Sequence, residues 1–463
     1  MAIITSYFAG ETYGMLGPQM AATIIQGHTA FECIVIAVTR DDDKLAIKKA
    51  LADYFHNQRP IIGFSTLSGR EDLFSLAREL KEEGATTILA GPQADRDFVG
   101  EVEWERYPYR FHGLADCFSF AVHGPAEQAM GVFDLLEKKE WRNAYGLLFA
   151  DNLNRVIQAE EKAWDETYLH SVRWDNLYRV GENGLQRLNI STGQVLQQIG
   201  CPYAGHENRV AIDYPVSIND WEGRRVEISL RGCSFCDVAS DKGFYGELDM
   251  ETVLDQIRCL PGDEDGRKIA FELINENPLH GLPRLLERVN NDDLLLSRIN
   301  LILRADWLIG GEERLRDALK SAQEMGISIL ASSVGFEAFD DRLLRNFHKG
   351  LTVDTNIRAI QLMRRLKESF PDVWHYSREE GAIHGFIHPT PWDTHETYVN
   401  TQKNISIYGL SRDILPPHST PLIIHHASAL GDWIREVEKR ENFHFKRYGS
   451  IIGWWDNPLE FYS

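Results

Sequence analysis

Apolar positions in the first 140 residues fall into short continuous runs that alternate with amphipathic stretches. The run "FECIVIAV" is typical of a strand buried on both faces, whereas "KLAIKKALADYFHNQ" spaces its apolar residues as a helix does. The later runs "PIIGFSTLSG", "EDLFSLARELKEEG" and "TTILAGPQ" continue the alternation. This succession predicts an α/β domain with a doubly wound, Rossmann-type parallel sheet over residues 1–140.

A second alternating series begins at Val226. Strand-like runs such as "VEISL", "KIAFELI", "INLILRAD" and "ISILASSVGF" are separated by helical patterns such as "GEERLRDALKSAQEMG". Repeated strand–helix pairs with short connections predict a full or partial (β/α) barrel over residues 226–400. We expect residues 401–463 to form a C-terminal substrate or lid region.

Residues 141–225 are less regular, and we predict a connecting region there. The stretch "NRVIQAEEKAWDETYLHSVRW" allows a helix. The stretch "YRVGENGLQRLNISTGQ" indicates turns, because glycine and asparagine recur in it.

Composition narrows the function classes. The chain has 463 residues, enough for two or three domains, and a formal net charge of −20. An acidic chain repels phosphate backbones, so we expect no nucleic-acid partner. We expect a cytoplasmic protein, because the sequence shows neither a signal-peptide pattern nor an apolar run of about 18 residues.

The first candidate for a functional site is the CxxC formed by Cys233 and Cys236, directly after "VEISL". The carboxyl ends of barrel strands carry the reactive groups in such folds. Two thiolates alone do not complete a metal site. Structural zinc would need two further Cys or His ligands, and a redox-active pair would lie at a helix start; both stay open as alternatives.

Six segments occur in a characteristic order. "TILAGPQADRDF" and "VHGPAEQAM" lie in the first domain, and "SLRGCSFCD" contains the CxxC. "INLILRADWL", "VGFEAFDDRLLRNFHKGLT" and "GFIHPTPWDTHET" follow. This series resembles the radical S-adenosylmethionine enzymes that carry a cobalamin-binding domain, although Trp392 stands where that family has a glycine. The resemblance spans most of residues 1–400 and implies a flavodoxin-like cobalamin-binding domain followed by a radical S-adenosylmethionine barrel.

The resemblance implies three cofactors: a [4Fe–4S] cluster, S-adenosylmethionine and cobalamin. In the family, three cysteines bind three irons and S-adenosylmethionine chelates the fourth. Electron transfer, from an external donor, then cleaves the sulfonium to a 5′-deoxyadenosyl radical. Many members use cobalamin to methylate an unactivated carbon.

The cysteine loop departs from the family spacing CxxxCxxC. Cys233 and Cys236 match its last two cysteines, but Ser229 stands where the first is expected. Cys201 lies in a polar, glycine-bearing loop before this segment, and we expect it to supply the third thiolate. Ser229, a histidine and an incomplete cluster are the alternatives. The remaining cysteines are predicted to be buried core thiols: Cys33, Cys117 and Cys259.

The family also implies contacts to S-adenosylmethionine. An aromatic ring lies beside the adenine, polar groups in "FELINENP" bind the amino group, a guanidinium binds the carboxylate, and a carboxylate binds the ribose. Phe235 matches the aromatic ring, and Glu272, Asn275 and Asn277 match the polar groups for the amino group. Arg304 matches the guanidinium for the carboxylate, and Glu337 matches the carboxylate for the ribose. An internal salt bridge is the alternative for the arginine, and helix capping for the asparagines.

For cobalamin, the family implies contacts from the loops at the strand ends, where ligands of parallel sheets bind. A DxHxxG motif does not occur in residues 1–140, so we expect no histidine ligand to the lower face of cobalt. The candidates are Ser65, Thr66, Leu67, Ser68, Gly91, Pro92, Gln93 and Gly124. A parallel-sheet domain without cobalamin is the alternative.

The leading hypothesis is a cobalamin-dependent radical methyltransferase that acts on an unactivated carbon of a protein, peptide or small molecule. Glutamine C-methylation of methyl-coenzyme M reductase is one named possibility for the substrate. A rearrangement or cyclisation with the same cofactors is the second hypothesis. The third is a non-catalytic cobalamin protein with a decayed cluster site. No residue is assigned to a proton-transfer or nucleophilic role.

Overall fold

The structure, a computed structural model, describes residues 1–56, 58–66, 69–91, 94–124, 126–132, 147–150, 156–158, 165–236 and 244–455. The chain divides into two compact units. The first comprises Met1–Gln194, Glu251–Pro261 and Arg447–Ile451, and the second comprises Val195–Met250, Gly262–Lys446 and Ile452–Ser463. None of the helices in these described ranges is long and apolar enough to cross a membrane.

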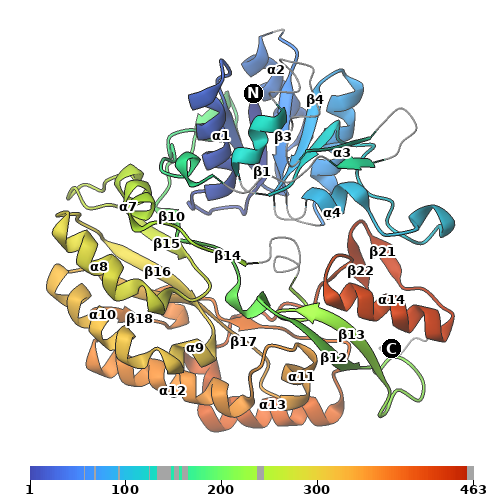
Figure 1. The fold of residues 1–463 in the computed structure, drawn as a ribbon, viewed down its shortest axis with the longest axis vertical. Helices are drawn as coiled ribbons and strands as arrows, with labels where there is room; N and C mark the ends of the chain where they lie inside the picture. Colours follow the sequence, from blue (N-terminus) through green and yellow to red (C-terminus); the bar gives the residue numbers. More distant parts are fainter. Residues whose placement is uncertain are drawn as a thin grey trace. The chain divides into compact units, whose positions relative to one another are not determined.

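The first unit is built around a nine-stranded sheet of order β7-β6-β5-β4-β3-β1-β2-β8-β9 (Figure 1). The central strands run parallel, whereas β6, β7 and β9 join the two edges in antiparallel register. The strands are β1 (Ala2–Ser6), β2 (Ile34–Val38), β3 (Ile61–Ser65), β4 (Thr86–Ala90), β5 (Phe120–Val122), β6 (Leu147–Ala150), β7 (Val156–Gln158), β8 (Leu177–Gly181) and β9 (Gly184–Arg187).

Helices cover both faces of this sheet. In β2, Val35 and Ala37 belong to a core shared with α1, whereas Ile36 and Val38 belong to a core shared with α2 and α3. Because successive residues of a strand point to opposite faces, a strand between two helical layers must be apolar throughout. The predicted doubly wound parallel sheet is therefore confirmed for this part of the chain. The helices that contribute to these cores are α1 (Leu16–His28), α2 (Lys44–Phe55), α3 (Glu71–Glu82) and α4 (Ala94–Val99). Helix α7 (Met250–Cys259) is assigned to the same unit from Glu251 onward.

Two predictions within residues 141–225 are wrong. The stretch predicted as turns contains the hairpin of β8 and β9, closed by a two-residue loop between Gly181 and Gly184. The glycine signal located the loop correctly, but the polar strands beside it carry no apolar pattern. Val156–Gln158, expected within a helix, is strand β7 and pairs with β6.

The second unit contains a six-stranded sheet of order β10-β15-β16-β17-β18, with β19 paired to β17. The pairs from β15 onward are parallel. Figure 1 shows α8, α10 and α12 along the outer side of this sheet. This arrangement confirms a mixed α/β fold with parallel sheets. The strands are β10 (Thr192–Leu196), β15 (Ala270–Ile274), β16 (Arg298–Leu303), β17 (Ser328–Glu337), β18 (Trp374–His375) and β19 (Gly385–Phe386). The helices are α8 (Leu282–Asn291), α9 (Ala305–Gly310), α10 (Glu312–Met325), α11 (Asp341–Asn346), α12 (Val353–Ser369), α13 (His395–Tyr408) and α14 (Ala429–Glu441).

The strand that precedes the CxxC is not part of this parallel sheet. "VEISL" lies in β13 (Arg225–Arg231), which pairs antiparallel with β12 (Glu207–Asp213). Its residues alternate between buried and exposed, as in a ribbon with one solvated face, whereas a barrel strand would be buried on both. The prediction that "VEISL" is the first barrel strand is therefore wrong, and β10 occupies the place beside β15.

Smaller sheets complete the described fold. β11 (Gln198–Gly200) pairs with β14 (Phe244–Glu247), and a three-stranded sheet has the order β20-β22-β21. Its strands are β20 (Ile424–His425), β21 (Lys446–Tyr448) and β22 (Ile451–Gly453). Trp454 is 2% exposed, and its indole N–H donates to the Leu422 carbonyl.

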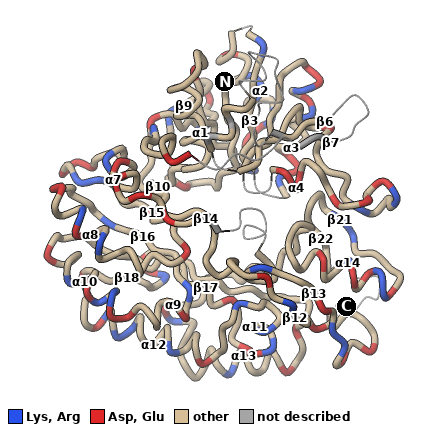
Figure 2. The backbone as a smooth tube through the Cα atoms, viewed as in Figure 1, with Lys and Arg blue, Asp and Glu red and all other residues tan. Residues whose placement is uncertain are grey.

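Charge is mixed on the outer helices of the second unit. Figure 2 shows acidic and basic residues interspersed along α8, α10, α12 and α13. In α10, Arg316 pairs with Glu312 at 2.9 Å and Lys320 pairs with Asp317 at 2.9 Å. These helices therefore present no continuous basic stripe of the kind that tracks a phosphate backbone.

Candidate functional site

A β-hairpin, β12–β13 (Glu207–Arg231), separates the two parts of the candidate cysteine site. Cys201 directly follows β11, and its backbone opens a short turn. The hairpin then runs out and back, so that Glu207 lies opposite Arg231. Facing residues of an antiparallel ribbon are about 5 Å apart. The hairpin therefore returns the segment that contains Cys233 to the neighbourhood of Cys201, despite their separation in sequence.

The thiols of Cys201 and Cys233 share one electrostatic environment. Nη1 of Arg304 lies 3.8 Å from Cys233 Sγ. Burial raises the pKa of Cys233 to about 11; Lys349 and Arg304 oppose this rise, while Cys201 adds to it. Burial is also the main cause of the raised pKa of Cys201, followed by the carboxylate of Glu276. The thiols are thus protonated by themselves, and a positive centre is needed to convert them to thiolates.

Cys236 lies one turn beyond Cys233, and its backbone N–H donates to the Cys233 carbonyl at 3.2 Å. The following residues, 237–243, lie outside the described ranges. No three Cys, His, Asp or Glu side chains are close enough to hold a single metal ion in the part of the chain that the structure describes. A cluster of several irons is wider than one ion and needs more widely spaced thiolates.

Arg304 contributes a second group beside the cysteines. Its guanidinium forms two hydrogen bonds to Asp306, at 3.1 and 3.3 Å, and donates to the Lys349 carbonyl at 2.6 Å. It also lies 4.0 Å from the centre of the Tyr203 ring, two residues after Cys201. The internal salt bridge considered as the alternative for this arginine is therefore present. Its guanidinium also faces Cys233, which places it at the cysteine site.

Glu337 and Lys349 form a buried ion pair at the end of β17, with Nζ 2.5 Å from Oε1. The backbone at Glu337 has a φ of 62°, which is uncommon for a residue other than glycine. Two glycines make room for this pair. A Cβ at Gly335 would lie 2.0 Å from Lys349 Nζ, and a Cβ at Gly385 would lie 2.6 Å from Glu337 Oε2. Small residues are therefore required on both sides of these charges.

The residues after β15 face the same region. Asn275 is buried, its amide donates to Gln197 at 2.9 Å, and its Oδ1 accepts from the Asn277 backbone at 2.7 Å. Glu276 lies in this turn, close enough for its carboxylate to raise the pKa of Cys201, and burial raises the pKa of the Glu276 carboxyl itself. Sequence reasoning chose the flanking asparagines and missed Glu276, although the same "FELINENP" segment contains it.

One face of the central strands is polar and partly open. Glu272, Asn300 and Leu330 are register neighbours on β15, β16 and β17. Asn300 is 0% exposed, and neither of its amide atoms has a hydrogen-bond partner among the described residues. Ile302, two residues further along the same face, is 37% exposed although strands flank it on both sides. The inner face of the sheet is therefore uncovered at this level.

Phe235 contacts an aromatic series. Its ring lies edge-on to Phe347 at 5.4 Å between centroids, and Phe347 lies edge-on to Trp392 at 5.7 Å. Trp392 is fully buried and takes the place of the family's glycine. The CxxC loop is thus packed against a rigid aromatic core. The adenine contact expected of Phe235 stays a prediction.

In the first unit, those predicted cobalamin residues that the structure describes lie at the ends of parallel strands. Ser65 ends β3, and a Cβ at Gly91, after β4, would lie 3.3 Å from Ser65 Oγ. Thr66 is buried, and its hydroxyl has no hydrogen-bond partner within the described ranges. Gly124, after β5, has a φ of 95°. Leu67, Ser68, Pro92 and Gln93 lie outside the described residues.

A buried pair at this edge was missed by sequence reasoning. His123 Nδ1 lies 3.4 Å from Asp95 Oδ1, next to Gly124. Burial by itself would raise the pKa of Asp95, but the hydrogen bond and charge of His123 outweigh it and lower the pKa. The segment "VHGPAE" contained the histidine, but its partner lies 28 residues earlier.

The other cysteines divide into two kinds. Cys33 and Cys117 are buried, as predicted. Cys259 is exposed, so its assignment to the core is wrong: it is the last residue of α7, beyond the buried face of that helix. Ser229 lies on the exposed face of β13, opposite Arg209.

Comparison with known proteins gives a fold but no sequence relative. No family model matches the chain, and no curated protein matches it. The chain is similar to solved structures of the cobalamin-dependent S-adenosylmethionine radical enzyme OxsB. The structure with aqua-cobalamin and S-adenosylmethionine bound matches with a TM-score of 0.62 and 13% identity, over 97% of this chain and 63% of that one. The structure with aqua-cobalamin alone gives 0.61 and 13%, over 98% and 64%. The apo structure gives 0.57 and 13%, over 97% and 63%. This chain thus spans less than two thirds of the length of OxsB.

Proposed function

We propose that the chain is a cobalamin-dependent radical S-adenosylmethionine enzyme that transfers a methyl group to an unactivated carbon. The observation that carries the proposal is the return of Cys233 to Cys201 by the inserted hairpin, beside the cations of Arg304 and Lys349. Cys201 would supply the third thiol, which the local loop lacks because Ser229 stands at the first cysteine position of the CxxxCxxC spacing. The likeness in fold to OxsB, which binds cobalamin and S-adenosylmethionine, supports the same cofactors here.

The residues present fit these groups. Cys201, Cys233 and Cys236 would hold the cluster. Near them, the Glu337–Lys349 pair offers a negative and a positive group to a zwitterionic ligand. We assign Phe235, Glu272, Asn275, Asn277, Arg304 and Glu337 to S-adenosylmethionine.

In the first unit, the buried hydroxyl of Thr66 has no hydrogen-bond partner among the described residues, which supports a ligand contact at this strand end. Ser65 and the positive-φ glycines beside it provide a surface with little side chain. We assign Ser65, Thr66, Leu67, Ser68, Gly91, Pro92, Gln93 and Gly124 to cobalamin.

The protein's own residues bind, orient and exclude water. When bound, the cluster supplies an electron to S-adenosylmethionine, and cobalamin carries the methyl group. Arg304, held by Asp306 and the Lys349 carbonyl, keeps a fixed positive charge beside Cys233. The aromatic contacts of Phe235 exclude water from one side of the CxxC loop. The uncovered inner face around Ile302 is our candidate for the substrate, a protein residue, peptide or small molecule.

The test begins with anaerobic reconstitution with iron and sulfide and measurement of iron, cobalt and corrin. We expect one [4Fe–4S] cluster and one cobalamin per chain, and reductant-dependent formation of 5′-deoxyadenosine from S-adenosylmethionine. Cys201→Ala is expected to lose the cluster, whereas the matched control Cys259→Ala, at an exposed cysteine, keeps it. Full iron in Cys201→Ala would contradict the assigned third ligand. Wild-type protein without iron or corrin would contradict the function and favour a decayed site.

Deuteromethyl S-adenosylmethionine separates the reaction classes. Methyl transfer adds the labelled methyl group to the product, which mass spectrometry detects. A product without added mass would instead identify a rearrangement or cyclisation. Candidate substrates include methyl-coenzyme M reductase peptides that contain glutamine.

A further inference from the structure

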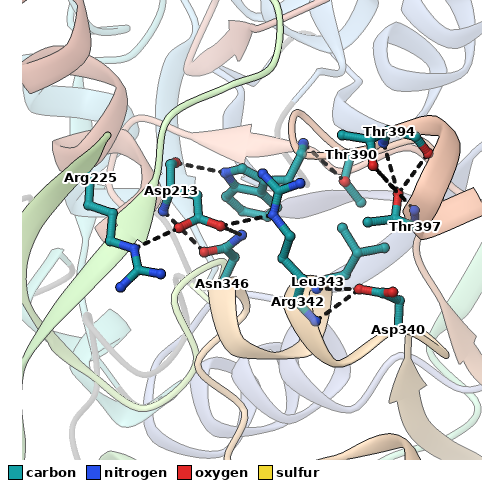
Figure 3. A network of polar contacts seen from close by, with 10 residues as sticks. Asp213, Arg225, Asp340, Arg342, Leu343, Asn346, Thr390, Thr394 and Thr397 are labelled. Carbon is teal, nitrogen blue, oxygen red and sulfur yellow. Dashed lines mark hydrogen bonds and ion pairs between the residues drawn. The ribbon is translucent and has the colours of Figure 1, made fainter. Parts of the chain in front are cut away.

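A buried carboxylate, Asp213, joins the inserted hairpin to the segment behind the cysteine loop (Figure 3). It ends β12, and its Oδ1 accepts from Arg225 Nε of β13 at 2.9 Å. Its Oδ2 accepts from Arg342 Nε at 3.0 Å and from Asn346 Nδ2 at 3.3 Å, both on α11. The backbone N–H of Asp213 donates to Asn346 Oδ1 at 3.1 Å. One side chain thus ties both hairpin strands to one helix.

The far end of α11 holds the CxxC loop. Ser234, between the two cysteines, donates its hydroxyl to the Asn346 carbonyl at 2.8 Å and its backbone N–H to the Phe347 carbonyl at 2.9 Å. Ser234 is 0% exposed, and its own carbonyl accepts from Leu430 N–H at 3.0 Å. A single residue, Asn346, therefore contacts Asp213 through its side chain and Ser234 through its backbone.

A second, apolar route runs in parallel. The indole N–H of Trp392 donates to the Asp213 carbonyl at 3.0 Å. The Trp392 ring contacts Phe347, and Phe347 contacts Phe235 of the CxxC. Both routes lead from the hairpin end to the two residues between Cys233 and Cys236.

The helix between them is itself anchored. Asp340 caps the start of α11 by accepting from Arg342 N–H and Leu343 N–H at 2.9 and 3.2 Å. Asn400 of α13 donates to the other oxygen of Asp340 at 3.1 Å. Figure 3 shows this cap and the Asp213 cluster at the two ends of the short helix. A displacement of the hairpin must therefore break charge-assisted hydrogen bonds, because the helix has little freedom to follow it.

We propose that Asp213 is a positioning residue for the cysteine site, which keeps the Cys233 segment in place relative to Cys201 before any cluster is bound. The inference rests on the proposed cluster site, because a loop split by a hairpin needs a device that the continuous family loop does not. Burial alone would raise the pKa of Asp213, but its hydrogen bonds from Arg342, Asn346 and Arg225 lower it, so the carboxylate is charged at neutral pH.

The test compares Asp213→Asn with Asp213→Glu and with a control on the same hairpin. The control, Arg209→Gln/Glu227→Gln, removes an ion pair of 2.9 Å whose side chains are 77% and 64% exposed. The first readout is hydrogen exchange of the peptide that contains Ser234, in the protein without cluster. The second is the rate of iron release to a chelator from the reconstituted protein, in buffer without denaturant.

Asp213→Asn is expected to accelerate both rates by about tenfold, since hydrogen bonds to a buried charge are lost. Asp213→Glu restores part of the protection, and the control leaves both rates unchanged. If Asp213→Asn does not fold, Ser234→Ala removes only the hydroxyl link and should accelerate both rates by about threefold. Equal rates in the Asp213→Asn or Ser234→Ala protein and the control would overturn the positioning role.

The two readouts separate this proposal from the proposed function. If hydrogen exchange is faster in Asp213→Asn but the wild-type protein takes up no iron, the proposed cluster site is contradicted and the positioning role of Asp213 is supported. If the wild-type protein binds the cluster and Asp213→Asn releases iron at the wild-type rate, the positioning role of Asp213 is contradicted and the cluster site is supported.

Discussion

Replacement of Gly335 by alanine tests the buried ion pair at the end of β17. The new Cβ would lie 2.0 Å from Lys349 Nζ and 2.6 Å from Glu337 Oε1, distances that atoms in van der Waals contact do not reach. The lysine must therefore move away from the carboxylate. The two side chains are only 9% and 10% exposed, so water replaces little of the lost interaction. Breaking a buried pair costs about 3–5 kcal/mol, and we expect about 3 kcal/mol because both charges remain.

The assay is urea unfolding followed by tryptophan fluorescence, with hydrogen exchange of the β17 peptide as a local measure. Gly310→Ala is the matched control, since a Cβ there has nothing within 4 Å and alanine is the better helix former. In a Glu337→Gln/Lys349→Met background, Gly335→Ala should lower the unfolding free energy less than it does in the wild-type protein, by a difference of about 1 kcal/mol or more, because the charged pair is gone. An equal cost in both backgrounds would refute the reasoning, as would a Gly335→Ala protein as stable as the control.

Three further predictions concern the second unit. Burial lowers the pKa of His384 to about 4, so the unfolded protein binds this proton more readily than the folded protein, and stability falls as the pH falls from 6.5 toward 4. Between pH 7.5 and pH 5, the unfolding free energy of His384→Gln should fall by about 2 kcal/mol less than that of the wild-type protein in chemical denaturation. An identical pH dependence of the two proteins would contradict this assignment. Asn300→Leu removes two buried amide atoms that have no hydrogen-bond partner among the described residues, and should raise the unfolding free energy by about 1–3 kcal/mol. A lower urea midpoint would show that the amide is paired. Trp392→Phe removes the hydrogen bond to the Asp213 carbonyl and part of a fully buried ring, and should lower the unfolding free energy by about 2 kcal/mol. An unchanged midpoint in thermal or urea unfolding would count against the route through the Trp392, Phe347 and Phe235 rings.

The local pattern of the chain predicted most of its elements. The run that ends at Val38 became β2, and the amphipathic stretches became α2, α3 and α10. These elements follow from period-2 and period-3.6 patterns, which neighbouring residues set by themselves. The local spacing of Cys233 and Cys236, and the place of Cys201 in a polar loop, were likewise visible in the sequence.

Tertiary structure decided where those pieces pair. "VEISL" had the pattern of a strand, but only its pairing with β12 shows that it belongs to an antiparallel hairpin instead of the parallel sheet. Arg304 carried a charge that suits a carboxylate ligand, and only the fold placed it between Asp306 and Cys233. Asp213 was unremarked in the sequence, because its partner Arg342 lies 129 residues away. A buried charge is stabilised by groups brought together through chain folding, and no local periodicity encodes such a meeting.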